Sequence, residues 1–179
     1  MKELIKKMIA ESIEKWTDED IYAVSLFVYD ENDNPSKPTV TLGYNTERQV
    51  AEALEEGFAE ENEARWNYAF WLQNSFFEFG RGDTAENVKQ WVIDNGFEYE
   101  EDDSEAEFGE DSEITEAFTA LLVDVVRELH EEKVLTAKFG KELPILIHEL
   151  EYYDEIAEQN VKANGEELVR DFTEFCMWG

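Results

Sequence analysis

The stretch Ile21-Tyr-Ala-Val-Ser-Leu-Phe-Val-Tyr-Asp30 decides the fold of this chain. It is dense in β-branched and aromatic residues, which favour a strand, and its nearly continuous apolar character predicts that both faces are covered. Residues 30–38 follow with the Asx and proline chemistry of a turn. Thr39–Tyr44 is again typical of a strand, so the two segments predict an antiparallel hairpin.

Amphipathic patterns on both sides of the hairpin predict helices. Residues 2–16 place apolar side chains at i, i+4 intervals, as expected for a helix with one buried face. Thr46-Glu-Arg-Gln49 has the form of a capping box and predicts a helix that continues to about Glu56 and ends at Gly57. Four later helices are expected, the first of them capped by Asp83 or Thr84, over about 84–95, 114–130, 153–163 and 168–176.

Two further segments are predicted to be strands. In Ala64–Leu72, the aromatic residues Trp66, Tyr68 and Phe70 alternate with smaller residues, although a helix through Trp66, Phe70 and Phe77 is the alternative. Leu143–Leu150 is predicted as a fourth strand. The order of elements indicates an α+β protein: a single domain over residues 1–179, with about four antiparallel strands packed against about six helices.

The charge of the chain excludes several kinds of partner. It has 45 Asp and Glu against 15 Lys and Arg, a formal net charge of −30. Nucleic-acid backbones and anionic membrane surfaces select Lys and Arg, so neither is an expected partner. Hydrophobic residues make up 42% of the chain and aromatic residues 13%, which indicates a real core and not a disordered acidic tail.

The same composition indicates a cytoplasmic protein. No apolar run approaches the roughly 20 residues of a membrane span, and the segment that begins at Met1 has no pattern of a secretion signal. Cys176 is the single cysteine, so an intrachain disulfide is impossible. It lies on an apolar helical stripe, where we expect a buried, unreactive thiol.

Acidic residues concentrate between Glu98 and Glu113. Ten of these sixteen residues are acidic and none is basic, so we expect an extended or mobile loop. With Glu55, Glu56, Glu60, Glu61 and Glu63 it forms a candidate contact surface, although a purely solubilising role is an equal alternative. The candidate partner-binding residues are Glu98, Glu100, Glu101, Asp102, Asp103, Glu105, Glu107, Trp66 and Trp71.

No motif for catalysis, a metal ion or a cofactor is present. Asp30-x-Asn32-x-Asn34 begins like a calcium loop, but Pro35 and Thr41 occupy the positions that need Gly and Glu. His130 and His148 have no second histidine or cysteine at metal-ligand spacing, and His148 is expected to be a buried structural residue. We therefore predict no catalytic, metal or cofactor-binding residue.

Several stretches resemble an uncharacterised bacterial family of acidic, single-domain α+β proteins. They are Tyr22–Asp30, Thr39–Thr46, Ala64–Trp71, Ile147–Asp154 through Asn164, and Asp171-Phe172, with Thr41–Asn45 as the most specific part. Such families are similar in style to the SUKH-type immunity proteins of bacterial toxin systems. The resemblance implies an α+β fold and carries over no catalytic residue.

Three functions follow as hypotheses. The first is a non-enzymatic protein-binding module of the immunity type that inhibits a basic toxin, since an acidic surface attracts a basic partner. The second is an enzyme or a small-ligand or metal site that forms only in three dimensions, with Glu149, Glu151, His148 and Tyr152 as first candidates. The third is a homodimeric scaffold that uses the aromatic residues of Trp66–Phe79 as its interface.

Overall fold

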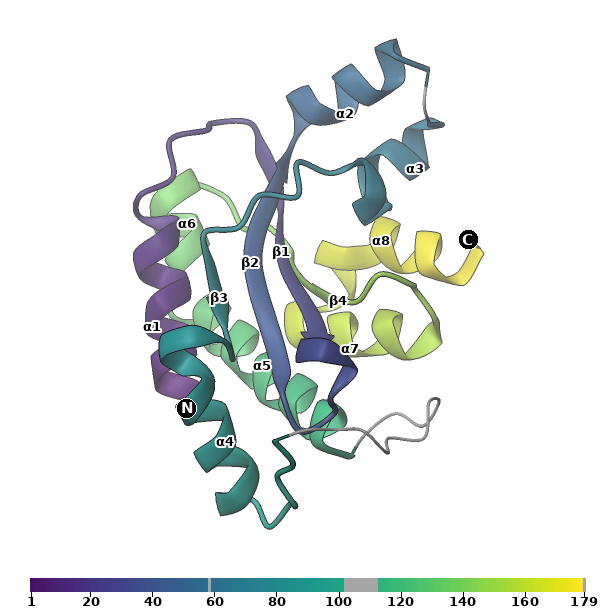
Figure 1. Cartoon of the computed structure of the whole chain (residues 1–179). Coiled ribbons are helices and arrows are strands. Elements are labelled where there is room, and N and C mark those ends of the chain that lie inside the picture. The colour runs from purple at the N-terminus through teal and green to yellow at the C-terminus, as the bar shows by residue number, and fades with distance from the viewer. Residues whose placement is uncertain (58, 102–112, 179) are drawn as a thin grey trace.

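The predicted hairpin forms the centre of a four-stranded sheet in the order β3-β2-β1-β4 (Figure 1). The computed structural model describes residues 1–57, 59–101 and 113–178. Strands β1 (Ile21–Asp30) and β2 (Pro38–Thr46) are antiparallel, with Leu26 opposite Leu42. The short strand β3 (Phe77–Phe79) pairs antiparallel with β2, and β4 (Ile145–His148) pairs parallel with β1.

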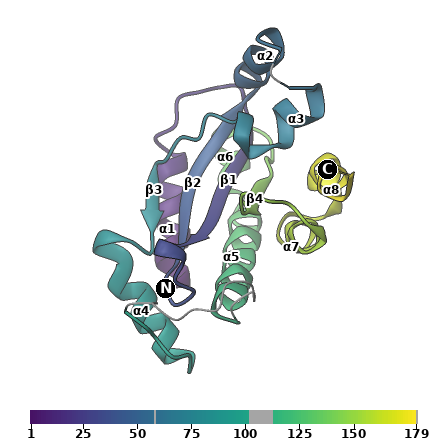
Figure 2. The same cartoon turned by 45° about the vertical axis from the view of Figure 1, so that its right-hand side comes forward.

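Eight α-helices in the described part of the chain surround this sheet. They are α1 (Lys2–Ile13), α2 (Glu47–Glu55), α3 (Glu61–Trp66), α4 (Ala85–Asp94), α5 (Glu113–Glu131), α6 (Val134–Phe139), α7 (Asp154–Asn164) and α8 (Glu166–Trp178). Three short 3₁₀ segments, η1 (Glu31–Asp33), η2 (Tyr68–Phe70) and η3 (Gly82–Thr84), connect them. Figure 2 shows α7 and α8 as a pair beside β4.

The fold class is the predicted α+β, and the hairpin and six expected helices are confirmed within a few residues. The expected number of about six helices holds, with two further short helices, α3 and α6. Two details of the prediction were wrong. The sheet is mixed and not wholly antiparallel, because β4 runs parallel to β1. The predicted strand Ala64–Leu72 is instead the end of α3 followed by η2, and the third strand lies further on, at Phe77–Phe79.

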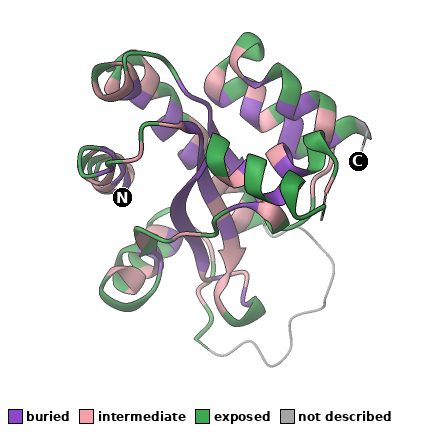
Figure 3. Cartoon of the chain, turned by 90° about the horizontal axis from the view of Figure 1, so that it is seen from above, coloured by how far each residue is buried: buried purple, intermediate pink, exposed green. Residues whose placement is uncertain are grey.

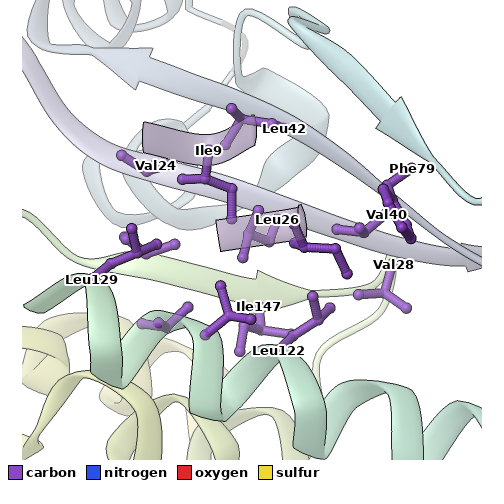
Figure 4. Close-up of a cluster of buried hydrophobic side chains, with 14 of the residues drawn as sticks. Ile9, Val24, Leu26, Val28, Val40, Leu42, Phe79, Leu122, Leu129 and Ile147 are labelled. Atoms are coloured by element: carbon purple, nitrogen blue, oxygen red, sulfur yellow. The ribbon is translucent and has the colours of Figure 1, made fainter. Parts of the chain in front are cut away.

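One face of the sheet packs against α1 and α5. The strand residues Val24, Leu26 and Ile147 point into this core, where they meet Ile9 from α1 and Leu122 from α5 (Figure 4). All five side chains are fully buried. The apolar side chains of α1 and α5 are thus buried against the apolar face of the sheet, as amphipathic helices require.

The opposite face packs against α3, η2 and α8. Its core contains many aromatic residues: Trp66 meets both Tyr22 of β1 and Phe172 of α8 in edge-on contacts. The central strands are therefore covered on both sides, as predicted, and the exposed residues lie on the outer faces of the helices (Figure 3).

Side-chain amides cover the outer edge of β4. Asn160 and Asn164, one turn apart on α7, replace a neighbouring strand. The backbone N–H of Ile147 donates to Asn160 Oδ1 (2.9 Å), and Asn160 Nδ2 donates to the Ile147 carbonyl (2.7 Å). Asn164 bonds the N–H and the carbonyl of Ile145 in the same way, at 2.8 and 3.0 Å. This edge is therefore not open to another strand.

A third asparagine closes part of the outer edge of β2. The backbone N–H of Tyr44 donates to Asn74 Oδ1 at 2.8 Å. This approach needs a glycine at position 43, because a Cβ there would lie 2.5 Å from the Asn74 backbone oxygen. The close packing gives a structural reason for the glycine at position 43.

Candidate functional site

A cleft of about 700 Å³ lies between α3 and α8, and we call it the α3–α8 cleft. Carboxylates dominate its lining, and two aromatic side chains, one arginine and one asparagine complete it. The lining residues are Glu60, Glu61, Asn62, Glu63, Arg65, Trp66, Asp171, Glu174 and Phe175. It thus combines three acidic residues predicted from the sequence with two from the C-terminal helix.

Local structure explains why the carboxylates of α3 face solvent. The Glu63 carboxylate accepts a hydrogen bond from the Glu60 backbone N–H at 3.2 Å, which closes the first turn of α3. Ala64 and Trp66 then lie on the buried side of this short helix. On α8, Phe172 and Cys176 are buried while Asp171 and Glu174 are exposed, so both helices present acidic faces.

Arg65 does not neutralise the α3–α8 cleft. Its guanidinium forms a bidentate pair with Glu47, at 3.0 and 2.7 Å, and lies over the Tyr22 ring. The Arg65 backbone carbonyl accepts hydrogen bonds from the Tyr22 hydroxyl and from Trp71 Nε1. Arg65 pairs with Glu47 and has a weaker electrostatic interaction with Glu61, so its single charge leaves the five carboxylates of the cleft with a net negative charge.

The predicted aromatic contact residues belong mainly to the core. Trp66 is 7% exposed and Trp71 is 4% exposed, and Phe79, at the end of the proposed dimer interface, is fully buried. Trp66 also lines the α3–α8 cleft. Phe76 is the member of the aromatic run Trp66–Phe79 with a large exposed area, at 43%.

The other acidic candidates are only partly described. Glu98, Glu100 and Glu101 are exposed, and their backbone is anchored to the hairpin turn, where Asn34 Nδ2 donates to the Glu100 carbonyl at 2.9 Å. Glu101 also pairs with Lys89. These three residues lie in an irregular segment without helix or strand, and the expectation of an extended or mobile loop stays a prediction. The candidates Asp102, Asp103, Glu105 and Glu107 lie outside the described residues.

The four residues of the alternative enzyme site do not converge. His148 and Tyr152 pack in the aromatic core between the sheet and α8. Glu151 is exposed. Glu149 lines a separate cavity between α5 and α7 and accepts a hydrogen bond from the Tyr153 hydroxyl at 3.0 Å.

His148 is a satisfied buried residue, as predicted. Its ring is 1% exposed, and Nδ1 lies 3.0 Å from the Glu149 backbone carbonyl. A carbonyl can only accept, so Nδ1 carries the proton and Nε2 accepts from the Ser25 hydroxyl at 2.8 Å. Burial lowers the pKa of His148 to about 4, so the ring is neutral at pH 7.

Cys176 and His130 also have structural surroundings. Burial raises the pKa of the Cys176 thiol to about 12, as expected for an unreactive cysteine. His130, in the last turn of α5, contacts Glu142 at 2.9 Å and Asn164 at 3.0 Å. Among the described residues, no group of three His, Cys, Asp or Glu side chains is arranged to hold a metal ion.

Within residues 1–57, 59–101 and 113–178, no helix combines the length and apolar character that crossing a membrane requires. Comparisons with family models, curated proteins and solved structures found no match to this chain. The functional argument therefore depends on the site itself.

Sequence reasoning missed two of the five carboxylates of the α3–α8 cleft, Asp171 and Glu174. In a chain with 45 acidic residues, chance alone produces such neighbouring pairs. Their only signal is that they lie on the exposed side of a helix whose other side is apolar. The packing of α8 beside α3 joins them to Glu60, Glu61 and Glu63, and no local pattern indicates that contact.

Proposed function

We propose that this protein is a non-enzymatic binding protein that receives a basic segment of another protein in the α3–α8 cleft. The single observation that carries the proposal is the lining of this cleft, where five exposed carboxylates surround an aromatic wall and the one arginine pairs with Glu47. Arg and Lys side chains complement such a surface, and Arg also stacks on aromatic rings.

The surrounding charge supports the same partner. Glu55 and Glu56 lie at the end of α2, which packs beside α3 (Figure 1). Together with the net charge of −30, they extend the negative field beyond the cleft. Such a field accelerates the encounter with a basic protein and disfavours acidic partners. We propose an immunity-type role in the cytoplasm, as an inhibitor of a basic toxin, and the resemblance to SUKH-type families agrees with it.

Matched charge variants test the site with an arginine-rich peptide as the probe. One variant carries Glu61→Gln, Glu63→Gln and Glu174→Gln in the α3–α8 cleft. The control carries Glu14→Gln, Glu86→Gln and Glu131→Gln at exposed positions outside it. Both lose three negative charges, so a general electrostatic attraction weakens equally in the two. We expect the cleft variant to bind at least about tenfold more weakly than the control by fluorescence anisotropy at 150 mM salt.

Equal affinities of the two variants would remove the α3–α8 cleft as the site. The immunity role has a separate test, because a toxin gene is expected beside the gene for its inhibitor. Co-expression with the neighbouring open reading frame is expected to relieve its toxicity, and the cleft variant is expected to relieve it less than the control. A non-toxic neighbour would contradict this role and leave the peptide result unaffected.

A further inference from the structure

His130 lies where three parts of the fold meet, and each of its two ring nitrogens has a partner. It is in the last turn of α5, and its side chain is 16% exposed. Nδ1 lies 2.9 Å from Glu142 Oε2, in the loop between α6 and β4. Nε2 lies 3.0 Å from Asn164 Oδ1, at the end of α7. A neutral imidazole has one N–H, so it can donate to one of these two oxygens and not to both.

The other hydrogen bonds of Asn164 fix the orientation of its amide. Oδ1 accepts from the Ile145 backbone N–H at 2.8 Å, and Nδ2 donates to the carbonyls of Ile145 and Asn160 at 3.0 and 3.1 Å. Exchanging the two amide atoms would place an NH₂ group against an N–H and an oxygen against two carbonyls. The atom that faces His130 is therefore an oxygen, and Nε2 must carry a proton to bond it.

The group on the other side of the ring is an acceptor as well. The Thr136 hydroxyl donates to Glu142 Oε1. Burial is the largest influence on the pKa of Glu142 and raises it, but the hydrogen bonds from Thr136 and His130 and the charges of His130 and Lys133 outweigh burial, so the pKa lies below its ordinary value. Glu142 is therefore a carboxylate at pH 7, and Nδ1 must also carry a proton. With two donor nitrogens, His130 is an imidazolium cation in this geometry.

The charges around the ring come from several elements. Glu142 supports the cation from the loop before β4, and the partner from α7, Asn164, is neutral. Lys133, the residue before α6, stabilises the carboxylate of Glu142 and opposes the charge of the ring. On α5 itself, Arg127 and Glu131 are both exposed. The dipole of α5 favours a cation in its last turn, so the close carboxylate and the helix end act together.

Loss of one proton affects the two contacts unequally. The hydrogen bond to a carboxylate is charge-assisted, so a neutral His130 keeps its remaining proton on Nδ1. The lone pair of Nε2 then faces Asn164 Oδ1, and two acceptors at hydrogen-bond distance repel each other. We propose that the Nε2 proton of His130 is a pH-sensitive clamp, which holds Asn164 against the edge of β4 and releases it as the pH rises. This proposal is independent of the function assigned to the α3–α8 cleft.

NMR of the ring nitrogens tests the protonation of His130 directly, because the chain has two histidines. At pH 7, where an unperturbed histidine is mostly neutral, we expect both nitrogens of His130 to be protonated. His148, whose Nε2 accepts from Ser25, is the internal reference with one bare nitrogen. Glu142→Gln is expected to leave His130 with one proton, and the control Glu131→Gln, which removes an exposed charge, is expected to leave both. A bare nitrogen on His130 of the wild type at pH 7 would overturn the proposal.

Hydrogen exchange tests the release of the edge of β4, with a control in the same strand. The Ile145 N–H donates to Asn164, whereas the Ile147 N–H donates to Asn160, one turn earlier on α7. Between pH 6 and pH 8.5, after correction for the intrinsic exchange rate, we expect the protection of Ile145 to fall at least about tenfold and that of Ile147 less than about twofold. In His130→Gln, whose side chain does not titrate, the difference between the two amides is expected to stay constant with pH. Equal changes at both amides of the wild type, or the wild-type response in His130→Gln, would contradict the clamp.

Discussion

His148 couples the stability of the fold to pH. Its folded pKa of about 4 lies well below the ordinary value of 6.5, because the ring is buried. Between these two values the unfolded chain binds more protons than the folded protein, so stability falls as the pH falls. Because the ring is fully buried, this coupling lowers the free energy of unfolding by about 2–3 kcal/mol between pH 7 and pH 4.5.

Urea denaturation of the wild type and of His148→Gln at pH 7 and pH 4.5 measures this coupling. Between pH 7 and pH 4.5, the free energy of unfolding is expected to fall by about 2–3 kcal/mol more in the wild type than in the variant. Asp30 acts in the opposite direction, because its raised pKa stabilises the fold on acidification, but it is present in both proteins and cancels in the difference. Identical pH dependence in the two proteins would show that His148 is not held neutral.

At the scale of elements, the amide ladder of α7 protects β4. Asn160 is fully buried and bonds both the N–H and the carbonyl of Ile147. Asn160→Ala leaves the Ile147 N–H without its partner, whereas the Ile147 carbonyl keeps the hydrogen bond from Gln159 Nε2 at 2.9 Å, so we expect a cost of about 2 kcal/mol. The opened edge is also expected to promote aggregation.

Asn87→Ala is the control, because Asn87 is an exposed residue of helix α4. Chemical denaturation measures the stability of the two variants, and light scattering measures their association. We expect Asn160→Ala to be less stable and to aggregate, and Asn87→Ala to behave like the wild type. Comparable stability of the two variants would mean that the ladder contributes little.

The element wrongly predicted from the sequence shows the limit of local patterns. Trp66, Tyr68 and Phe70 alternate as in a strand, but five residues are too few to distinguish a period of 2 from a helical turn. The Glu63 side chain closes the first turn of α3, and Asn67 Oδ1 accepts from the Ala69 N–H to begin η2. Contacts of Trp66 with Tyr22 and Phe172 also favour the helical conformation over a strand, and these contacts are tertiary.

The candidate sites depend even more on long-range packing. The hairpin and the long helices were predictable because each has several periods of pattern. The parallel pairing of β4 with β1 was not predictable from local patterns, because the direction of a strand in the sheet depends on the path of the chain before it. Likewise, His130 and Asn164 are two polar residues far apart in the sequence. The packing of α7 against α5 and β4 brings them together.

At the scale of the whole molecule, repulsion among the charges that give the net −30 destabilises the folded state. Some ion pairs reduce this repulsion: Lys2 and Lys6 both bond Glu128, at 2.6 and 2.7 Å, and lower its pKa to about 2. With 15 basic residues for 45 acidic ones, pairing cannot compensate most carboxylates. Long-range repulsion therefore exceeds the local attractions. Salt weakens this repulsion, because charges farther apart than the Debye length, about 10 Å at 0.1 M salt, are screened from one another.

We therefore expect the melting temperature to rise by a few degrees between 20 and 500 mM sodium chloride, equivalent to about 1–2 kcal/mol. Binding of the basic probe peptide is expected to weaken over the same range, because screening reduces attraction between the proteins as well as repulsion within one. Differential scanning calorimetry and anisotropy at matched salt concentrations measure the two trends. A melting temperature that falls with salt would show that ion pairs such as Lys6–Glu128 outweigh the net charge.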